Sequence, residues 1–444
     1  MNFLDKKRHI FVLFLILFLG SIISCRKNIQ LKIIPRPGVD ENILEPIEGI
    51  KGFSTINGYK VQEGKFYFTG IKDNQWNLYS IDLETKAIKV IHQEVENHDL
   101  YIALGERAAV YIDMEGRFFY RKDNRERKID QGVTGLHRPN LLISPDQKAV
   151  LYTKGTDKRA DLYLYLFGAK KPLLIKENIT ESAFNTFSFT TQWSHKGDYF
   201  IYNNEEIYNI MGQLKTTINA TAAVWSPEGD YIAYIKKPVD LQKNKIIIGD
   251  WETYIGEEFI ILCLLDMKES LVYKSSLGLI DPIDNIQWGK NAKQVGISVG
   301  KINKSTDNEL EGLDYNKIFV YNLIKEKGIE LEDVPYNYYE IFLDNYLYGS
   351  HLGKKSIMEI IPIEKGVRKV YKSPVLLNSK NLFVIAHKDK GYFVDGKSLM
   401  EISKGGRERQ VIELAWEVNE MYLDSKTESL IITNKDMEIY LLKL

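Results

Sequence analysis

Short runs of apolar and aromatic residues alternate with polar turns from about residue 46 to the end of the chain. Runs of this length, rich in β-branched and aromatic residues, predict strands. No stretch between them shows the amphipathic period of a helix. The predicted strands are residues 65–68, 77–82, 87–91, 109–112, 117–120, 149–152, 161–165, 172–175, 199–202, 206–210, 231–234, 259–265, 271–273, 295–298, 318–323, 346–348, 382–385, 430–433 and 439–442.

One strand–turn–strand unit recurs in the middle of the chain. Residues 224–234 read Val-Trp-Ser-Pro-Glu-Gly-Asp-Tyr-Ile-Ala-Tyr. Pro227 presets φ at the first central position of the turn, and Gly229 supplies the positive φ that closes it. Further copies stand at 193–202, 143–152 and 287–298. A repeated unit of this kind predicts an array of similar sheets.

The spacing of the runs predicts the architecture of the array. Nine candidate units, some of them half units, follow one another at roughly 40 residues, the spacing of four-stranded propeller blades. We therefore expect an all-β fold, a single β-propeller with eight blades, or with seven or nine. Residues 437–442 end the chain in a strand, and residues 47–53 could supply its outer neighbour. The tryptophans that precede the turns are expected to pack between blades.

The repeated unit resembles a known family. Residues 225–234 are similar to the WD40-like repeat of TolB-type propellers, whose usual form is Trp-Ser-Pro-Asp-Gly-Lys followed by a short apolar strand. The other three copies match it less well. The resemblance implies a β-propeller and no single activity, because propellers carry many functions.

The first segment predicts export. Lys6, Lys7 and Arg8 precede the apolar run 10–19, which is short for a membrane span and typical of a secretory signal. The residues before Cys25 resemble a bacterial lipobox, although Ile22 stands where leucine is usual and Ile23 where a small residue is usual.

The resemblance implies a signal peptide over 1–24 and a lipidated Cys25. The polar and proline-containing residues up to 45 predict a tether, and the strand pattern predicts a propeller over 46–444. The alternative is an uncleaved anchor with an incidental cysteine. Both place the rest of the chain outside the cytoplasmic membrane, with the lipid at Cys25 attaching it to the bilayer.

Charge and cysteine content narrow the possible partners. The chain has 59 basic and 60 acidic residues, with no long run of like charge, so we expect no nucleic-acid partner. Cys25 and Cys263 are the only cysteines, too few for a disulfide framework or a cysteine zinc cluster. Aromatic residues make up 12%, with 27 tyrosines, which suits pleated sheets. An aromatic-lined binding face is the alternative.

No catalytic or metal motif is found. The sequence has no Gly-x-Ser-x-Gly elbow, Walker loop, His-Glu-x-x-His or EF-hand loop. Its seven histidines are scattered along the chain. We therefore predict no cofactor, no metal and no assignable catalytic residue.

Two insertions interrupt the repeats, and long loops often carry function. Residues 237–258 contain Trp251 and Tyr254, the candidate binding loop. Residues 303–316 offer oxygen atoms for a calcium hypothesis, although their spacing fits no known calcium loop. These oxygen-bearing residues are Asp307, Asn308, Glu309, Glu311 and Asp314. Solvated variation is the alternative for both insertions.

These features favour a non-enzymatic, membrane-tethered propeller outside the cytoplasm. Its expected role is to bind or scaffold an envelope protein or component through loops on one rim. The alternative is a propeller enzyme, a glycan or peptide hydrolase or lyase, with its site in the central channel. Acidic side chains with raised pKa values would indicate that enzyme. A sensor of a small ligand is a third possibility.

Overall fold

A computed structural model describes the chain from Leu44 to Leu444 with short gaps. Outside the description lie residues 1–43, 51–52, 94, 96–99, 124, 134–139, 157, 249–250, 281–285, 335–337, 344, 351–356, 365–368, 373–383, 435 and 437. The predicted signal peptide, Cys25 and most of the tether therefore lie outside the described residues.

The described strands form nine four-stranded sheets and one two-stranded hairpin. This confirms the prediction of an all-β propeller built from four-stranded blades, and the count falls within the range of seven to nine that the sequence allowed. The chain divides into two compact units: a terminal unit, which runs up to Glu94 and resumes over Asp424–Leu444, and a central unit, Val95–Leu423. Each is described by itself.

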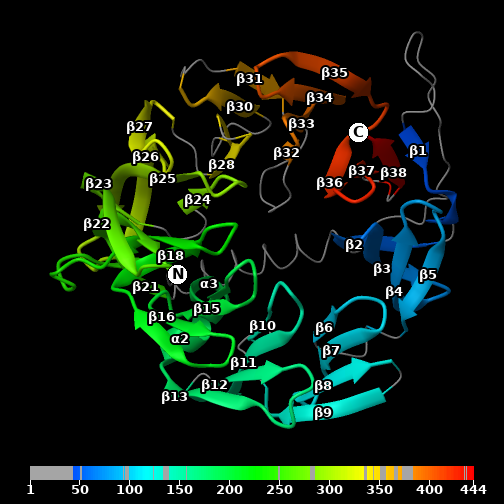
Figure 1. The fold of residues 1–444 in the computed structure, drawn as a ribbon, viewed down its shortest axis with the longest axis horizontal. Coiled ribbons are helices and arrows are strands. Elements are labelled where there is room, and N and C mark those ends of the chain that lie inside the picture. Colours follow the sequence, from blue (N-terminus) through cyan, green and yellow to red (C-terminus); the bar gives the residue numbers. More distant parts are fainter. Residues whose placement is uncertain are drawn as a thin grey trace, which may run out of the picture. The chain divides into compact units, whose positions relative to one another are not determined.

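The central unit contains seven consecutive blades, numbered 2 to 8 among the described strands (Figure 1). Blade 2 consists of β6 (Leu100–Ala103), β7 (Ala108–Ile112), β8 (Arg117–Lys122) and β9 (Arg125–Gln131). Blade 3 consists of β10 (Leu141–Ile143), β11 (Ala149–Thr156), β12 (Arg159–Leu166) and β13 (Leu173–Ile179). Blade 4 consists of β14 (Gln192–Trp193), β15 (Tyr199–Tyr202), β16 (Glu206–Asn209) and β17 (Leu214–Thr217). Blade 5 consists of β18 (Ala220–Trp225), β19 (Tyr231–Lys236), β22 (Gly256–Cys263) and β23 (Lys268–Leu279).

Three more blades complete this unit. Blade 6 consists of β24 (Ile286–Trp288), β25 (Gln294–Lys304), β26 (Leu310–Asn322) and β27 (Lys327–Glu332). Blade 7 consists of β28 (Tyr338–Phe342), β29 (Tyr346–Ser350), β30 (Ile357–Pro362) and β31 (Lys369–Lys372). Blade 8 consists of β32 (Val384–His387), β33 (Lys390–Asp395), β34 (Ser398–Ser403) and β35 (Glu408–Glu413). The extra hairpin, β20 (Lys245–Ile248) and β21 (Trp251–Tyr254), lies in the chain between β19 and β22.

The terminal unit joins the two ends of the described chain. Blade 1 consists of β2 (Thr55–Gln62), β3 (Lys65–Lys72), β4 (Gln75–Asp82) and β5 (Ile88–His92). The last sheet has the order β1-β38-β37-β36, from β1 (Leu44–Pro46), β36 (Val418–Asp424), β37 (Ser429–Asn434) and β38 (Ile439–Lys443). Of these strands, β36 belongs to the central unit up to Leu423. β1 pairs antiparallel with β38, Leu44 opposite Leu442. The last strand thus has an N-terminal neighbour, as expected.

The predicted position of that neighbour was wrong by a few residues. β1 lies partly within the predicted tether, whereas the apolar residues assigned to the strand mostly pack elsewhere. Ile47 and Phe53 are buried, a short 3-10 helix, η1, runs over Glu48–Ile50, and the ring of Phe53 packs edge-on to Tyr79 of β4. Because Ile47 and Phe53 are buried in the core, the preceding residues of β1 form the edge strand of the last sheet.

The repeated turn joins the first and second strands of blades 3 to 6. In blade 5 the buried Ser226 bonds through its backbone N–H to the carbonyl of Tyr231 (2.8 Å), and its hydroxyl accepts the N–H of Tyr231 (3.1 Å). Gly229 has φ 75°. Gln147 in blade 3 and Ala292 in blade 6 occupy the equivalent position, with φ 58° and 57°. The weaker copies therefore keep the turn but place residues with side chains in a conformation that suits glycine.

The tryptophans of the repeat connect consecutive blades, as predicted. The indole N–H of Trp193 donates to the carbonyl of Leu142 in blade 3 (3.0 Å). Trp225 donates to Gln192 in blade 4 (3.3 Å), and Trp288 donates to Val224 in blade 5 (3.2 Å). Each blade from 4 to 6 thus bonds to its predecessor through the same side chain. This role is structural.

Tyrosines add a second set of bonds to carboxylates. Tyr152 of blade 3 donates to Asp130 of blade 2 (2.8 Å), which also pairs with Lys154 (2.7 Å). Burial, and then the hydrogen bond to Asp130, raise the pKa of Tyr152, so the hydroxyl stays a donor. Other pairs are Tyr208–Glu206, Tyr422–Glu420 and Tyr440–Glu438. These bonds account for part of the high tyrosine content and favour its interpretation as sheet composition.

Several described elements are absent from the sequence prediction, among them two short helices and one edge strand. The helices α2 (Glu181–Asn185) and α3 (Phe187–Thr190) follow β13, where no helix was expected. They are shorter than the window in which an amphipathic period can be recognised. The strand β9 was also missed, because its residues Arg125–Gln131 are mostly exposed and charged. Fourth strands lie at a blade edge, where burial imposes no apolar pattern.

Candidate functional site

The central unit has two opposite faces. The turn between strands one and two lies at the same end of each blade as the turn between strands three and four, because the two are hydrogen-bonded. In blades 4, 5 and 6 the backbone N–H groups of Ile210, Leu264 and Leu323 donate to the carbonyls of residues 198, 230 and 293. We call this side the turn face. The opposite side, which carries the second-to-third connections and the links between blades, is the insertion face.

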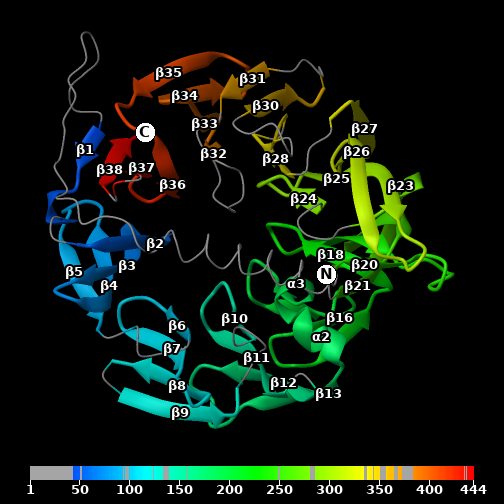
Figure 2. The ribbon, with the colours of Figure 1, turned by 180° about the vertical axis from the view of Figure 1, so that it is seen from behind.

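Both insertions singled out in the sequence fall on the insertion face. Residues 237–255 leave blade 5 between its second and third strands and form the hairpin β20–β21. Residues 303–316 lengthen β25 and β26, the second and third strands of blade 6. Both hairpins can be followed in Figure 2. The two insertions were expected to be loops, but the structure shows that strands form much of each.

The first hairpin has an inner and an outer side. Ile246 and Thr253 pair in register and are both buried. On the other side Lys245 pairs with Tyr254 in register and forms an ion pair with Glu252 (2.5 Å). Tyr254 is half-buried there.

Trp251 is described by its backbone alone. It begins β21 opposite Ile248, and its side chain lies outside the description. The structure therefore places Trp251 and Tyr254 on one strand of the insertion, and their predicted role in binding remains a prediction.

The second hairpin does not gather a calcium site. Asp307 lies in the turn at the tip, whereas Asp314 lies on β26 opposite Lys301, and the amide of Asn303 donates to Asp314 (3.3 Å). The side-chain oxygen of Asn308 accepts a hydrogen bond from the ammonium of Lys304 (3.0 Å). Across the described part of the chain, no group of three or more His, Cys, Asp or Glu residues is placed to hold a metal ion.

The two insertions bond to one another. The backbone N–H of Ile247 donates to the carbonyl of Asn308 (2.7 Å), and Ile247 forms an isolated parallel bridge with Glu309. The Lys304 ammonium also donates to the carbonyls of Lys243 (2.7 Å) and Lys245 (3.2 Å). We call residues 237–255 and 303–316 together the insertion pair. Sequence reasoning treated them separately, although both occupy the second-to-third connection of consecutive blades and so had to lie on one face.

The helices of blade 4 support the insertion pair. α2 contacts β21, and Phe184 of α2 and Phe187 of α3 are buried in the core. The hydroxyl of Thr180 caps α2 by accepting the N–H of Ala183 (3.1 Å). Phe189 of α3 stays half-exposed. Packed side chains thus fix the backbone beneath the β20–β21 hairpin.

A charged pair joins blades 4 and 5 on the same face. The ammonium of Lys237 contacts the carboxylate of Glu205, and both side chains are mostly covered. Burial lowers the pKa of Lys237. Beside them the amide of Asn204 donates to the carbonyl of Thr221 (3.1 Å). The first insertion therefore begins at a residue that is tied to the neighbouring blade.

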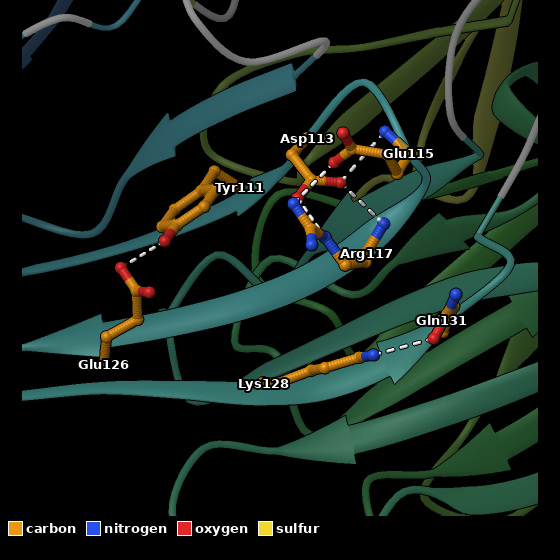
Figure 3. A network of polar contacts seen from close by, with 7 residues as sticks. All are labelled: Tyr111, Asp113, Glu115, Arg117, Glu126, Lys128 and Gln131. Atoms are coloured by element: carbon orange, nitrogen blue, oxygen red, sulfur yellow. Dashed lines mark hydrogen bonds and ion pairs between the residues drawn. The ribbon is translucent and has the colours of Figure 1, made fainter.

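A separate polar network closes the β7–β8 turn of blade 2 (Figure 3). The Asp113 carboxylate accepts the backbone N–H (2.9 Å) and the guanidinium Nε–H (2.6 Å) of Arg117. Burial alone would raise the pKa of Asp113, but these bonds outweigh it and lower the pKa. Tyr111 donates to Glu126 across the same sheet. These side chains hydrogen-bond to other groups of the same blade, so we interpret the network as structural.

Carboxyl groups elsewhere show the same direction of shift. Burial would raise the pKa of Glu401, but hydrogen bonds from Arg409 (two contacts of 3.0 Å) and an ion pair with Lys390 (3.1 Å) lower it. Among the described carboxyl groups, every resolved shift is downward. The raised carboxyl pKa that would indicate a catalytic channel is not seen in this part of the chain.

Cys263 ends β22 and is partly buried as a free thiol. Within the described residues, none of the helices has the length and apolar character needed to cross a bilayer.

Comparison with known proteins gives no family. No family model matches the sequence, and no curated protein does. Among solved structures, the oligogalacturonate lyase of Vibrio parahaemolyticus aligns over 90% of both chains with 10% identity and a TM-score of 0.37. An oligogalacturonate lyase in complex with manganese covers 86% of both chains with 12% identity and a TM-score of 0.31. The tricorn protease covers 88% of this chain with 12% identity and a TM-score of 0.32, and this chain spans 42% of that protein. None of these similarities bears on what this chain does.

Proposed function

We propose that this protein is a binding or scaffolding module that holds a protein partner on the insertion pair. The observation that carries the proposal is the bonding of two insertions from consecutive blades, through Ile247 and Asn308 and through the Lys304 ammonium. The first insertion lies outside the four strands of blade 5, and the second extends β25 and β26 well beyond the length of the other two strands of blade 6. Together they extend one face with ordered backbone, which lowers the entropy cost of binding a partner.

The surface around the insertion pair has the mixed character of a protein interface. Val239 is fully exposed, at 105% of its reference area, and Leu241 and Phe189 are also exposed. The first insertion also carries the Lys245–Glu252 ion pair and the half-buried Tyr254. Apolar and aromatic side chains with a polar surround are typical of binding hot spots.

We further propose that the propeller is attached to the outer side of a bacterial cytoplasmic or outer membrane through lipid at Cys25. The leader pattern before Cys25 and its resemblance to a lipobox support this location. The expected partner is therefore an envelope protein or surface component.

The proposal is tested by crosslinking and pull-down of the full chain from native membranes. The variant Trp251→Ala with Tyr254→Ala, and separately Val239→Asp with Leu241→Asp, should lose a captured partner while the melting temperature is kept. Met114→Asp, a change at another exposed apolar position on blade 2, is the matched control and should retain it. An unchanged set of captured proteins in both insertion variants would refute the proposal.

A further inference from the structure

Exposed apolar side chains gather on the turn face. The third-to-fourth turns of blades 3 to 6, each with the first residue of the next strand, are residues 167–173, 210–214, 264–268 and 323–327. We call them the turn strip. Of fourteen exposed large apolar side chains among the described residues, six lie in the turn strip. They are Leu173, Met211, Leu214, Leu265, Met267 and Ile324.

The side chains at the tips of the turns are far more exposed than core packing would leave them. Leu265 is 94% exposed, Ile324 69% and Met211 60%. The side chain of Leu173 in blade 3 lies against Gly212 in the turn of blade 4. A Cβ atom added at Gly212 would be only 2.5 Å from the Cδ2 atom of Leu173. The apolar surface is therefore continuous between blades 3 and 4, and it recurs at blades 5 and 6.

The turn strip is positively charged. It contains five lysines and two carboxylates, which are Lys170, Lys171, Lys268, Lys325, Lys327, Asp266 and Glu326. All five lysines are exposed. The first-to-second turns on the same face are balanced, with four lysines and four carboxylates, which are Lys148, Lys196, Lys290, Lys293, Asp146, Asp198, Glu228 and Asp230. The excess of positive charge therefore belongs to the strip that carries the apolar tips.

We propose that the turn strip docks onto the surface of an anionic lipid bilayer. Single apolar side chains at the ends of turns can each enter the boundary between headgroups and acyl chains. The neighbouring lysines extend to the anionic headgroups and keep their charge in water. Lys325 already pairs with Glu364 (2.6 Å). Charge complementarity selects this occupant, since anionic headgroups offer counterparts to the other four exposed lysines, which an electrically neutral surface does not.

The inference assigns an orientation to the molecule. With the turn strip against lipid, the insertion pair on the opposite face points away from the membrane, towards a partner. The inference rests on the proposed membrane attachment, but not on partner binding at the insertion pair. The two can therefore fail separately.

The test is hydrogen–deuterium exchange of the full chain in detergent and in vesicles. Vesicles of phosphatidylcholine alone are compared with vesicles that also contain phosphatidylglycerol. Amides of the turn strip should exchange more slowly on the anionic vesicles, and those of the β7–β8 turn should be unchanged. Binding of the strip should weaken by about fivefold for each lysine that loses an anionic headgroup.

Variants make the test specific. Leu265→Glu with Ile324→Glu should return the strip to its exchange rate in detergent, whereas Met114→Glu on the insertion face should not. Both changes are at exposed positions, and the melting temperature verifies folding. Flotation separates the two proposals: a chain that does not float with vesicles lacks the membrane attachment. A chain that floats but exchanges at the detergent rate overturns the docking. Protection in detergent that rises with protein concentration would indicate a second copy on the strip, and would overturn it as well.

Discussion

Replacing Trp225 with phenylalanine tests whether the repeated tryptophan holds neighbouring blades together. Trp225 is 2% exposed and donates its indole N–H to the carbonyl of Gln192 in blade 4 (3.3 Å). Its ring stacks on Tyr199 of the same neighbour, with ring centroids 6.4 Å apart. Phenylalanine keeps an aromatic ring in this place but cannot donate the hydrogen bond.

The magnitude follows from two losses. The hydrogen bond contributes about 1 kcal/mol to the free energy of unfolding. The smaller ring leaves a cavity that costs about 1 kcal/mol more. The sum of about 2 kcal/mol corresponds to roughly 30-fold faster exchange of the amides that open at this junction.

Amide exchange is the suitable assay, because an array of blades need not unfold in a single step. Peptides from β14, β15, β18 and β19 should exchange faster in Trp225→Phe, and those from blade 8 should not. Trp76→Phe in β4, where the side chain is half-exposed, is the control and should change little. Unchanged exchange at β14 and β18, or an equal rise in blade 8, would refute the account of the tryptophan as a junction between blades.

Three further predictions concern stability. Ala292→Gly should stabilise the chain by about 0.5–1 kcal/mol in urea unfolding, because Ala292 has φ 57°, and Gly229→Ala should destabilise it by a similar amount; opposite signs would contradict the turn assignment. Ile47→Ala should cost about 2–4 kcal/mol, because the side chain is buried where η1 follows β1, and an unchanged melting temperature would count against that packing. Glu401→Gln should cost about 2 kcal/mol at pH 7 through the lost contacts with Arg409. Since the folded pKa of Glu401 is lowered, its contribution is present above about pH 4.3 and is lost as the pH falls through the folded pKa, so the variant and the parent should converge in acid and a constant difference would contradict this.

Part of the fold was predictable because its signals are local. Pro227 and Gly229 define a turn from the conformations open to them alone, and the same turn was recognisable at residues 193–202 with other side chains. Second and third strands with a buried centre, such as Tyr231–Lys236, carry a continuous apolar run and could be identified directly. The role of the tryptophans followed from their regular place before each turn.

Some of the missed elements lack such signals. β9 is charged because it lies at a blade edge, and α2 and α3 are too short to show a helical period. The outer neighbour of the last strand was assigned to Ile47 and the residues after it, because their apolar side chains suit a strand equally well. Whether such apolar residues form an edge strand or fill the core depends on the space available in the folded core.

The candidate site shows the same division. The amino-acid pattern alone shows that two insertions exceed the repeat and that Trp251 and Tyr254 lie in one of them, and it predicts four-stranded sheets along the chain. Tertiary structure alone decided that the insertions bond through Ile247 and Asn308 and that the exposed apolar tips share the opposite face with lysines. The physical reason is that strand and turn preferences act between residues close in sequence. Contacts between blades depend on the packing of whole sheets, which no single segment encodes.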